Sequence, residues 1–383
     1  METCKICLTT LEKAVYVSPA EFSLTSLCEV LPGKTEVFFC AHCGHLQTSE
    51  LENLAQYYDQ AYKILIESDD EDQLYEVSGD TQIFRFDHQA RVLLSKVNLA
   101  PGAFILDYGC AKSTTLKLLT RSRPDLVPHL FDVSEMYVPF WQLFAAPENW
   151  ATYKPRDGWQ GRFDLVTSFF AFEHVSDPRA ELASIAALLK TDGVFYCIVP
   201  NVYANTADFV VADHVHHYSP SSVERLLSEQ GFSAIEIDSE AHHSAFVVTA
   251  RKSAKAVADA IIEPNEGLMD SVTEMAAYWA GFAEEVRTFE RACGTAGKAA
   301  IYGSGFYGTF VATCLQERNR VSCFIDRNSF RQGKTLLGLP IVAPEELPAD
   351  VTLVYVGLNP VHAREEIAKV KSWRGRRLNY FYP

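Results

Sequence analysis

Apolar and polar positions from residue 104 onward are arranged in an order that predicts a strand, a turn, a helix and a second strand. Residues 104–106 form an apolar run typical of a buried strand, and mostly small residues at 109–113 predict a tight turn. Leucines recur at helical spacing within 116–119, and a second strand is expected over 127–131. An aspartate follows each strand. The pattern predicts half of a nucleotide-binding βαβ unit.

The same domain continues with further alternating elements. A strand is expected over 163–168, a helix over 180–189 and a strand over 194–199 after the turn Asp192-Gly193. The segment 172–178 follows the first of these strands and carries an adjacent glutamate and histidine. Strands that alternate with helices predict a parallel sheet, so the fold class is α/β.

A second βαβ pattern begins near residue 299. A strand over 299–302 leads into a complete G-x-G-x-x-G, formed by Gly303, Gly305 and Gly308, and the next strand ends at Asp326. The three glycines would place helix N–H groups against a phosphate, as for a sugar-nucleotide diphosphate. An oxidoreductase that uses this motif for NAD is an alternative, and a fold that only closes over the substrate is another.

Between the two patterns, residues 253–296 are mostly helical in pattern. Apolar residues recur at spacings of three and four, which predicts one apolar stripe formed by Val272, Met275, Trp279, Phe282, Val286 and Phe289. We expect a linking helix that packs on its own chain, and a dimer contact is the alternative. The oligomeric state is left open between monomer and homodimer.

Charge and composition narrow the class of partner. The 383 residues include 34 basic and 49 acidic ones, a net charge of −15, which is unsuited to neutralising a phosphate backbone. No apolar run approaches the ~20 residues that span a bilayer, and METCKICLTT does not have the zones of a signal peptide. We expect a cytoplasmic protein that acts on a small molecule, with neither nucleic acid nor membrane as partner.

Four of the ten cysteines form two C-x2-C pairs, Cys4 with Cys7 and Cys40 with Cys43. Each pair on a tight turn directs two thiolates toward one ion, and two such turns close a tetrahedral S4 site. Four protein ligands leave no open position, so we expect a structural Zn²⁺. A module of about 50 residues gains stability from such an ion because its own core is small.

The turn Asp107-Tyr108-Gly109-Cys110-Ala111-Lys112-Ser113 resembles the first motif of class I S-adenosylmethionine-dependent methyltransferases, D/E-x-G-x-G-x-G. The following elements, with FDLV and EHV-x-DP, also occur in the order of that family. The resemblance implies S-adenosylmethionine as cofactor. It implies a cofactor-binding set formed by Asp107, Gly109, Ala111, Asp132 and Ser168, in which Asp132 binds the ribose hydroxyls.

The segment Ala212–Pro220 concentrates acid–base residues after the fifth strand, where open α/β sheets bind ligands. A hydroxyl or activated carbon must lose a proton as it attacks the sulfonium methyl, and histidine suits that step. We take His214 as the base and Asp213 as the group that orients it, with His174 entering from a neighbouring strand end. A metal site of His214, His216 and His217 is an alternative to packing roles for the last two.

Taken together, the three parts resemble nucleotide-sugar C-methyltransferases, which combine a four-cysteine module, a class I domain and a Rossmann-like domain. That family has a Glu-His pair with a tyrosine two residues before the glutamate. Here Asp213 and His214 occupy the pair and Val211 the tyrosine position, while His174 matches a family histidine. The resemblance implies methyl transfer to a small, nucleotide-linked sugar, with C- and O-methylation both open.

The predicted architecture has four parts: a zinc module over 1–50, a methyltransferase domain over 51–252, a linking helix over 253–296 and a Rossmann-like domain over 297–383. The alternatives are an O-methyltransferase of another small metabolite and a non-catalytic scaffold whose cofactor site has degraded at Ala111 and Ser113.

Overall fold

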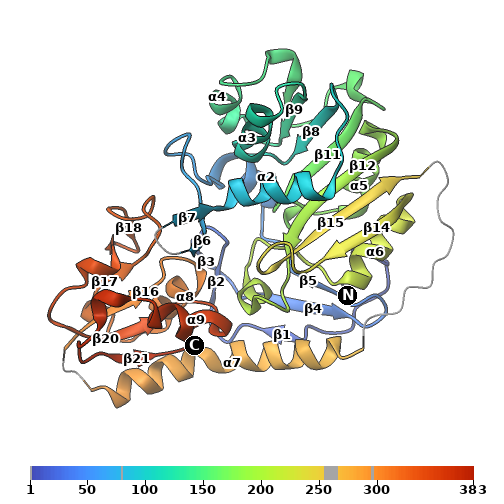
Figure 1. The fold of residues 1–383 in the computed structure, drawn as a ribbon. Coiled ribbons are helices and arrows are strands. Elements are labelled where there is room, and N and C mark those ends of the chain that lie inside the picture. The colour runs from blue at the N-terminus through green and yellow to red at the C-terminus, as the bar shows by residue number, and fades with distance from the viewer. Residues whose placement is uncertain (1, 79–80, 254–265, 295–296) are drawn as a thin grey trace. The chain divides into compact units, whose positions relative to one another are not determined.

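A computed structural model describes residues 2–78, 81–253, 266–294 and 297–383 (Figure 1). The chain divides into two compact units. The first unit combines Met1–Val15 with Glu36–Val272, and the second combines Tyr16–Thr35 with Thr273–Pro383. The four-part division expected from the sequence stays a prediction.

The first unit is built on a seven-stranded sheet with the order β10-β9-β8-β11-β12-β15-β14. Five strands are parallel, and β15 runs antiparallel to both of its neighbours. The strands are β8 (Phe104–Tyr108), β9 (Val127–Asp132), β10 (Trp150–Thr152), β11 (Phe163–Phe169), β12 (Leu189–Pro200), β14 (Phe232–Asp238) and β15 (Ala245–Lys252). When the seven strands of this sheet are numbered in chain order, their order in the sheet is 3-2-1-4-5-7-6. The order therefore reverses between β8 and β11, where open α/β sheets bind ligands.

Helices cover both faces of this sheet because side chains along each strand alternate between the faces. Leu106 and Val166 lie in the cluster that α5 and α6 cover, while Ile105 and Leu165 lie in the cluster that α2, α3 and α4 cover. The helices are α2 (Arg85–Lys96), α3 (Thr114–Ser122), α4 (Val138–Trp141), α5 (Pro178–Leu188) and α6 (Pro220–Glu229). Asp177 and Ser219 cap α5 and α6 through side-chain oxygens that accept backbone N–H groups.

The N-terminal part of this unit adds a small sheet to the domain. In it β13 (His216–His217) pairs antiparallel with β5 (His45–Thr48), which also pairs with β4 (Glu36–Cys40). Next along the chain come α1 (Leu54–Gln56), a π-helical turn over Tyr57–Ala61, and the hairpin of β6 (Leu74–Ser78) and β7 (Thr81–Phe84). The pairing of β5 with β13 joins the cysteine-bearing segment to the histidine-rich segment.

The second unit contains a six-stranded sheet with the order β18-β19-β17-β16-β20-β21. All of its neighbouring strands are parallel except the pair β18–β19. Its elements are β1 (Tyr16–Val17), β2 (Phe22–Leu24), β3 (Val30–Pro32), β16 (Lys298–Tyr302), α8 (Phe306–Cys314), β17 (Val321–Ile325), β18 (Thr335–Leu336), β19 (Leu339–Val342), β20 (Val351–Val356), α9 (Pro360–Ala368) and β21 (Asn379–Phe381).

The predicted apolar stripe lies on α7 (Leu268–Ala292), within the residues expected to form the linking helix. In the second unit Trp279 stacks on Tyr307 with ring centroids 5.7 Å apart, and Phe282 meets Phe310 at 5.5 Å. Phe289 meets Tyr355 at 5.5 Å. The stripe from Trp279 onward therefore packs on its own chain. No helix in the described part of the chain is both long and apolar enough to cross a membrane.

Candidate active site

The turn between β8 and α3 keeps the backbone conformation of a glycine-rich loop with fewer glycines. Gly109, Ala111 and Ser113 have φ values of +68°, +44° and +56°. This left-handed region is unfavourable for residues with a β-carbon, so Ala111 and Ser113 carry local strain. Gly109 is required by space as well, because a β-carbon there would lie 2.8 Å from Ala171 Cβ.

Asp107 holds this turn from inside. Its Oδ2 accepts a hydrogen bond from Ser113 Oγ at 2.5 Å, and its Oδ1 accepts one from Thr167 Oγ1 at 2.9 Å. Burial raises the pKa of the carboxyl to about 7, against the opposing effect of these two bonds. Ser113, which stands at the position of the last glycine in the motif, thus stabilises the turn through its hydroxyl group.

Asp132, at the end of β9, lies beside the turn. Its Oδ2 accepts the backbone N–H of Ala111 at 2.8 Å, and its Oδ1 accepts that of Ser134 at 3.1 Å. Burial raises its pKa to about 6. Each carboxylate oxygen can accept a further bond, so the position fits the two hydroxyls of a ribose. Ser168, on β11, is also buried near the carboxyl edge of the sheet.

These observations fit S-adenosylmethionine to the turn. The left-handed conformations retained at Gly109, Ala111 and Ser113 and the acid at the end of the second strand are features expected to hold such a nucleoside. Lys112 projects elsewhere: its Nζ donates to the carbonyl oxygens of Ser68, Asp69 and Glu71 at 2.8–3.1 Å. The lysine within the motif therefore binds the acidic run that precedes β6.

A second polar group lies where β11 ends. His174 belongs to the 3-10 turn Phe172–His174, and its Nδ1 lies 2.6 Å from Tyr58 Oη and 3.0 Å from the Asp213 carbonyl oxygen. The Tyr58 hydroxyl donates to the same carbonyl at 2.8 Å. The hydroxyl therefore accepts from His174 Nδ1–H, which leaves a lone pair on His174 Nε2. Burial lowers the pKa of His174 to about 4.

His214 is oriented by Asp208. Its Nδ1 lies 2.5 Å from Asp208 Oδ1, and the other carboxylate oxygen lies 2.8 Å from His217 Nδ1. Burial alone would lower the pKa of His214, but the charge and hydrogen bond of Asp208 outweigh it and raise the pKa to about 9. The orienting position that the sequence suggested for Asp213 is thus occupied by Asp208. The Asp213 carboxylate lies 3.9 Å from His174 Nδ1.

The bonds around His214 continue into the N-terminal segment. His217 Nε2 lies 2.8 Å from Thr48 Oγ1, and His216 bridges His45 Nε2 at 3.0 Å to the Val175 carbonyl oxygen at 2.9 Å. His216 and His217 are fully buried, and each bonds through both ring nitrogens. Their roles are therefore packing and hydrogen bonding.

Glu173 completes the polar group. Its Oε1 lies 4.0 Å from His174 Nε2, while the His174 and His214 rings are perpendicular with centroids 4.7 Å apart. Ligand atoms of these three residues lie within 4.8 Å of one another, whereas the sequence had suggested His214, His216 and His217 as a metal alternative. Burial raises the pKa of Glu173 to about 8.

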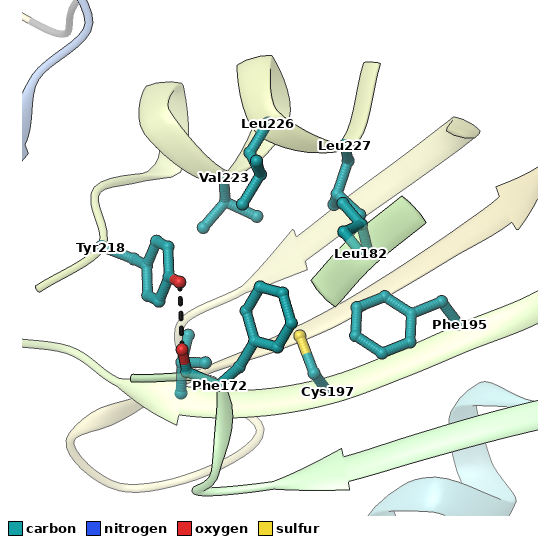
Figure 2. A pocket seen from close by; sticks show the side chains of 9 residues that line it. Phe172, Leu182, Phe195, Cys197, Tyr218, Val223, Leu226 and Leu227 are labelled. Atoms are coloured by element: carbon teal, nitrogen blue, oxygen red, sulfur yellow. Dashed lines mark hydrogen bonds between the residues drawn. The ribbon is translucent and has the colours of Figure 1, made fainter. Parts of the chain in front are cut away.

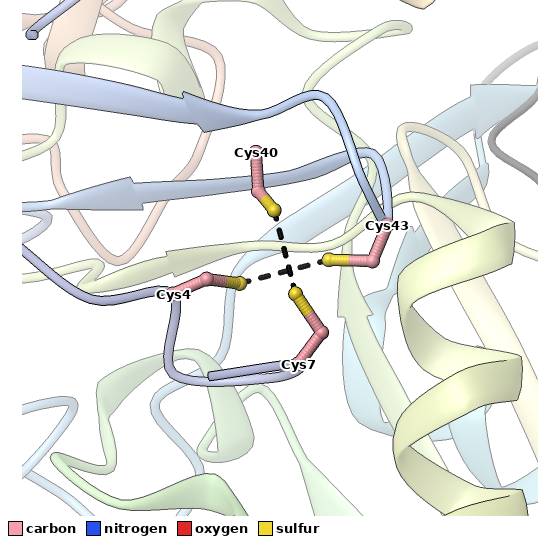
Figure 3. Close-up of side chains that lie close together, drawn as sticks. All are labelled: Cys4, Cys7, Cys40 and Cys43. Carbon is pink, nitrogen blue, oxygen red and sulfur yellow. Dashed lines mark hydrogen bonds between the residues drawn. The ribbon is translucent and has the colours of Figure 1, made fainter. Parts of the chain in front are cut away.

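The four predicted cysteines converge as expected. Cys4 Sγ lies 3.6 Å from Cys43 Sγ, and Cys7 Sγ lies 3.4 Å from Cys40 Sγ. Figure 3 shows the sulfurs pointing toward one another from two turns. All four thiols are free. Zn–S bonds of about 2.3 Å place the sulfurs of a tetrahedral site roughly 3.8 Å apart, so the geometry fits a four-coordinate ion.

A pocket between α6 and the sheet differs from these polar groups because its lining is apolar (Figure 2). Eight of its nine lining residues are apolar side chains such as Phe195 and Leu226, and the ninth is Tyr218, whose hydroxyl donates to the Phe172 carbonyl oxygen at 3.2 Å. The pocket is part of the apolar core under α6 and offers no acid–base group.

Sequence reasoning missed Asp208, Glu173 and Thr48. Glu173 directly precedes a predicted site histidine, so its position was a usable signal. Asp208 lies in the 3-10 segment Thr206–Val210, six residues before His214, and no single helix or strand carries both residues. Tyr58 lies 116 residues from His174, and only the fold brings the two together.

Comparisons with known proteins agree with this geometry. Residues 84–237 match the profile of a family described as "Methyltransferase domain". The C-methyltransferase NovU of Streptomyces niveus is 27% identical over 227 residues, which cover 55% of this chain and 54% of that protein. The match therefore spans about half the length of that relative.

A Ubiquinone biosynthesis O-methyltransferase of Xanthomonas campestris is 27% identical over 187 residues, or 46% of this chain and 74% of that protein. Among solved structures, an S-adenosylmethionine dependent methyltransferase from Mesorhizobium loti has a TM-score of 0.36 at 17% identity, covering 44% of this chain and 100% of that one. That score is too low to add to the sequence matches. On the profile match and the strand order, the part of this chain around residues 84–237 is a class I S-adenosylmethionine-dependent methyltransferase domain.

Proposed function

We propose that the protein transfers a methyl group from S-adenosylmethionine to a small, nucleotide-linked sugar, with His214 as the general base. When bound, the cofactor supplies an electrophilic methyl group on a sulfonium. The observation that supports the base is the 2.5 Å contact of His214 Nδ1 with Asp208, which directs the lone pair to Nε2. His214 Nε2 accepts the proton that the acceptor oxygen or carbon loses.

Other residues hold the reacting groups in place. Asp208 keeps the orientation and tautomer of His214, and Tyr58 does the same for His174, whose Nε2 is then a second acceptor beside the methyl acceptor. Asp213, expected from the sequence to act with His214, contributes its backbone carbonyl to both Tyr58 and His174. Phosphate binding by the turn of Gly303, Gly305 and Gly308 stays a prediction from the sequence, with open space only at the β-carbon position of Gly305.

Transfer to carbon is supported by the match to a C-methyltransferase, and the sugar substrate is supported by the architecture that the sequence resembles. Transfer to oxygen of another small metabolite is the second candidate, supported by the match to an O-methyltransferase. The choice between them is a choice of acceptor, because both need the same cofactor turn and base.

Methyl transfer can be measured with isotopically labelled S-adenosylmethionine and a panel of nucleotide-sugars, followed by mass spectrometry and NMR of the product. We expect a labelled product, and its loss in His214→Asn with cofactor binding retained. NMR then assigns the methyl group to carbon or oxygen. Failure of S-adenosylhomocysteine to bind at millimolar concentration would favour the scaffold alternative and end this proposal.

We further propose that Cys4, Cys7, Cys40 and Cys43 hold one structural Zn²⁺. Elemental analysis of the purified protein should give about one zinc per chain, and Cys4→Ser combined with Cys43→Ser should remove it and destabilise the fold. Cys28→Ser is the matched control, since Cys28 lies outside both pairs. Full metal content in the double variant would contradict the assignment.

A further inference from the structure

Three polar side chains near the end of β11 each have a buried atom without a hydrogen-bond partner in the described chain. They are Arg85 Nε, Glu173 Oε2 and His242 Nε2. Glu173 is 1% exposed and His242 is 4% exposed. Leaving a buried polar group unpaired costs about 1–3 kcal/mol, and more for a charged one. Such a concentration in one place indicates groups that a ligand completes.

Phe170 contacts two of these side chains, Arg85 and His242. The Arg85 guanidinium lies over the Phe170 ring, with Cζ 5.0 Å from its centroid, and the His242 ring lies 5.3 Å from the same centroid. Phe170 directly follows β11, and Glu173 follows it by three residues. The charge of Arg85 is close enough to act on both Glu173 and His242. The set therefore adjoins His174 and His214.

The chemistry of the open atoms defines a ligand. Arg85 offers an N–H donor and a positive charge, which suit an anionic oxygen. His242 Nδ1 lies 2.9 Å from the His243 carbonyl oxygen and donates to it, so its Nε2 is an acceptor. Glu173 supplies a second acceptor, because a carboxyl keeps acceptor capacity even when its raised pKa leaves it protonated. Two acceptors beside one cation suit a molecule that carries hydroxyl groups next to an anionic group.

We infer that Arg85, His242 and Glu173 form the binding site for an anionic, polyhydroxylated acceptor, whose phosphate or carboxylate pairs with Arg85 while its hydroxyls donate to His242 and Glu173. This inference rests on the proposed function and names the acceptor's chemistry. The hydroxyl or carbon nearest Glu173 is then the one that reaches His174 and His214.

The test is calorimetry on the full-length protein saturated with S-adenosylhomocysteine. Glucose 1-phosphate and glucuronate are the anionic probes, and glucose is the neutral one. We expect at least one anion to bind and glucose not to bind. Binding of glucose 1-phosphate would identify the anionic group of the acceptor as a phosphate, and binding of glucuronate would identify it as a carboxylate. In Arg85→Gln the affinity for that anion should fall by about tenfold or more.

Arg91→Gln is the matched control, because Arg91 lies on the same helix but is exposed, and it should bind as the wild type does. Wild-type protein that binds neither anion would overturn the inference, as would equal affinity in Arg85→Gln. The wild-type result stands even if Arg85→Gln fails to fold. Loss of the S-adenosylhomocysteine isotherm itself would instead contradict the proposed function.

Discussion

The two strand–turn–helix motifs of this chain share a backbone plan but differ in what their carboxylates have left to bind. In the first, Ala111 N donates to Asp132 Oδ2 at 2.8 Å. In the second, Ser304 N donates to Asp326 Oδ2 at 3.0 Å. Each acid thus closes its own turn in the same way.

The surroundings of the two acids separate them. Asp326 also accepts the Ser304 hydroxyl and the Asn328 N–H, and Arg331 donates to the Ser304 carbonyl oxygen at 2.6 Å. Side chains of the second motif therefore occupy the position that a ribose would use. The described hydrogen bonds to the Asp132 side chain come from backbone N–H groups. Because this carboxylate is buried, further hydrogen-bond donors from a ligand would stabilise its charged form.

The glycines lead to the same conclusion. The second motif is complete in sequence, but a β-carbon at Gly308 would lie 1.9 Å from the Gly303 carbonyl oxygen, and one at Gly303 would lie 2.3 Å from the Gly357 carbonyl oxygen. Internal packing accounts for these two glycines. In the second motif the glycines are needed because neighbouring segments of the chain pack closely against the turn. Whether a nucleoside fits is expected to depend on the hydrogen-bond partners of the aspartate at the end of the second strand.

The largest expected effect separates the two acids directly. Asp132→Ala should weaken S-adenosylhomocysteine binding by about 100-fold or more, because it removes the acceptors of two ribose hydroxyls. Asp326→Ala should leave that affinity unchanged. Isothermal titration of both variants checks this, and equal losses in the two would contradict the assignment of the cofactor to the first motif.

Asp208→Asn should lower kcat by about 100-fold, within the range of general base catalysis. The pKa of His214 is raised to about 9, so the base form increases with pH and the rate should rise toward alkaline pH. Removing the carboxylate lowers that pKa, so the rising limb should move to lower pH. A pH–rate profile measures both changes, and an unshifted limb would exclude His214 as the titrating base.

The group of Asp208, His214 and His217 is expected to depend on the hydroxyl of Thr48, which is far away in the sequence. The second motif, in contrast, is closed by hydrogen bonds within its own loop. Thr48→Val leaves His217 Nε2 without its partner and should loosen Asp208 and His214, lowering kcat by about tenfold with little change in KM. Thr48→Ser restores the hydroxyl and should recover most of the activity. Equal activity of the valine variant would show that this bond has only a structural role.

The smallest effects test the glycines of the second motif. Gly308→Ala should destabilise the protein by about 3 kcal/mol, because its β-carbon meets a backbone oxygen. Gly305→Ala should stay within about 0.5 kcal/mol, since nothing lies within 4 Å and its φ is −96°. Chemical denaturation measures both. A reversed order would mean that packing does not explain the complete motif.

Much of this fold could be predicted because the relevant signals are local. The strands at 104–106, 127–131 and 163–168 lie within β8, β9 and β11. The two C-x2-C pairs converge because each pair occupies one turn and two turns suffice for four ligands. The apolar stripe on α7 followed from helical periodicity, and its burial followed from the need to cover it.

By itself the sequence determined the α/β class and the group of four cysteines, and it predicted the cofactor turn with its acid and His174 and His214 as candidate site residues. The tertiary structure alone decided that Asp208 orients His214, that Tyr58 and Thr48 reach the site, and that Arg85 and His242 meet around Phe170. Periodicity and spacing encode contacts within one element. Hydrogen bonds between elements more than one hundred residues apart depend on how the sheet and its loops pack, which no local pattern records.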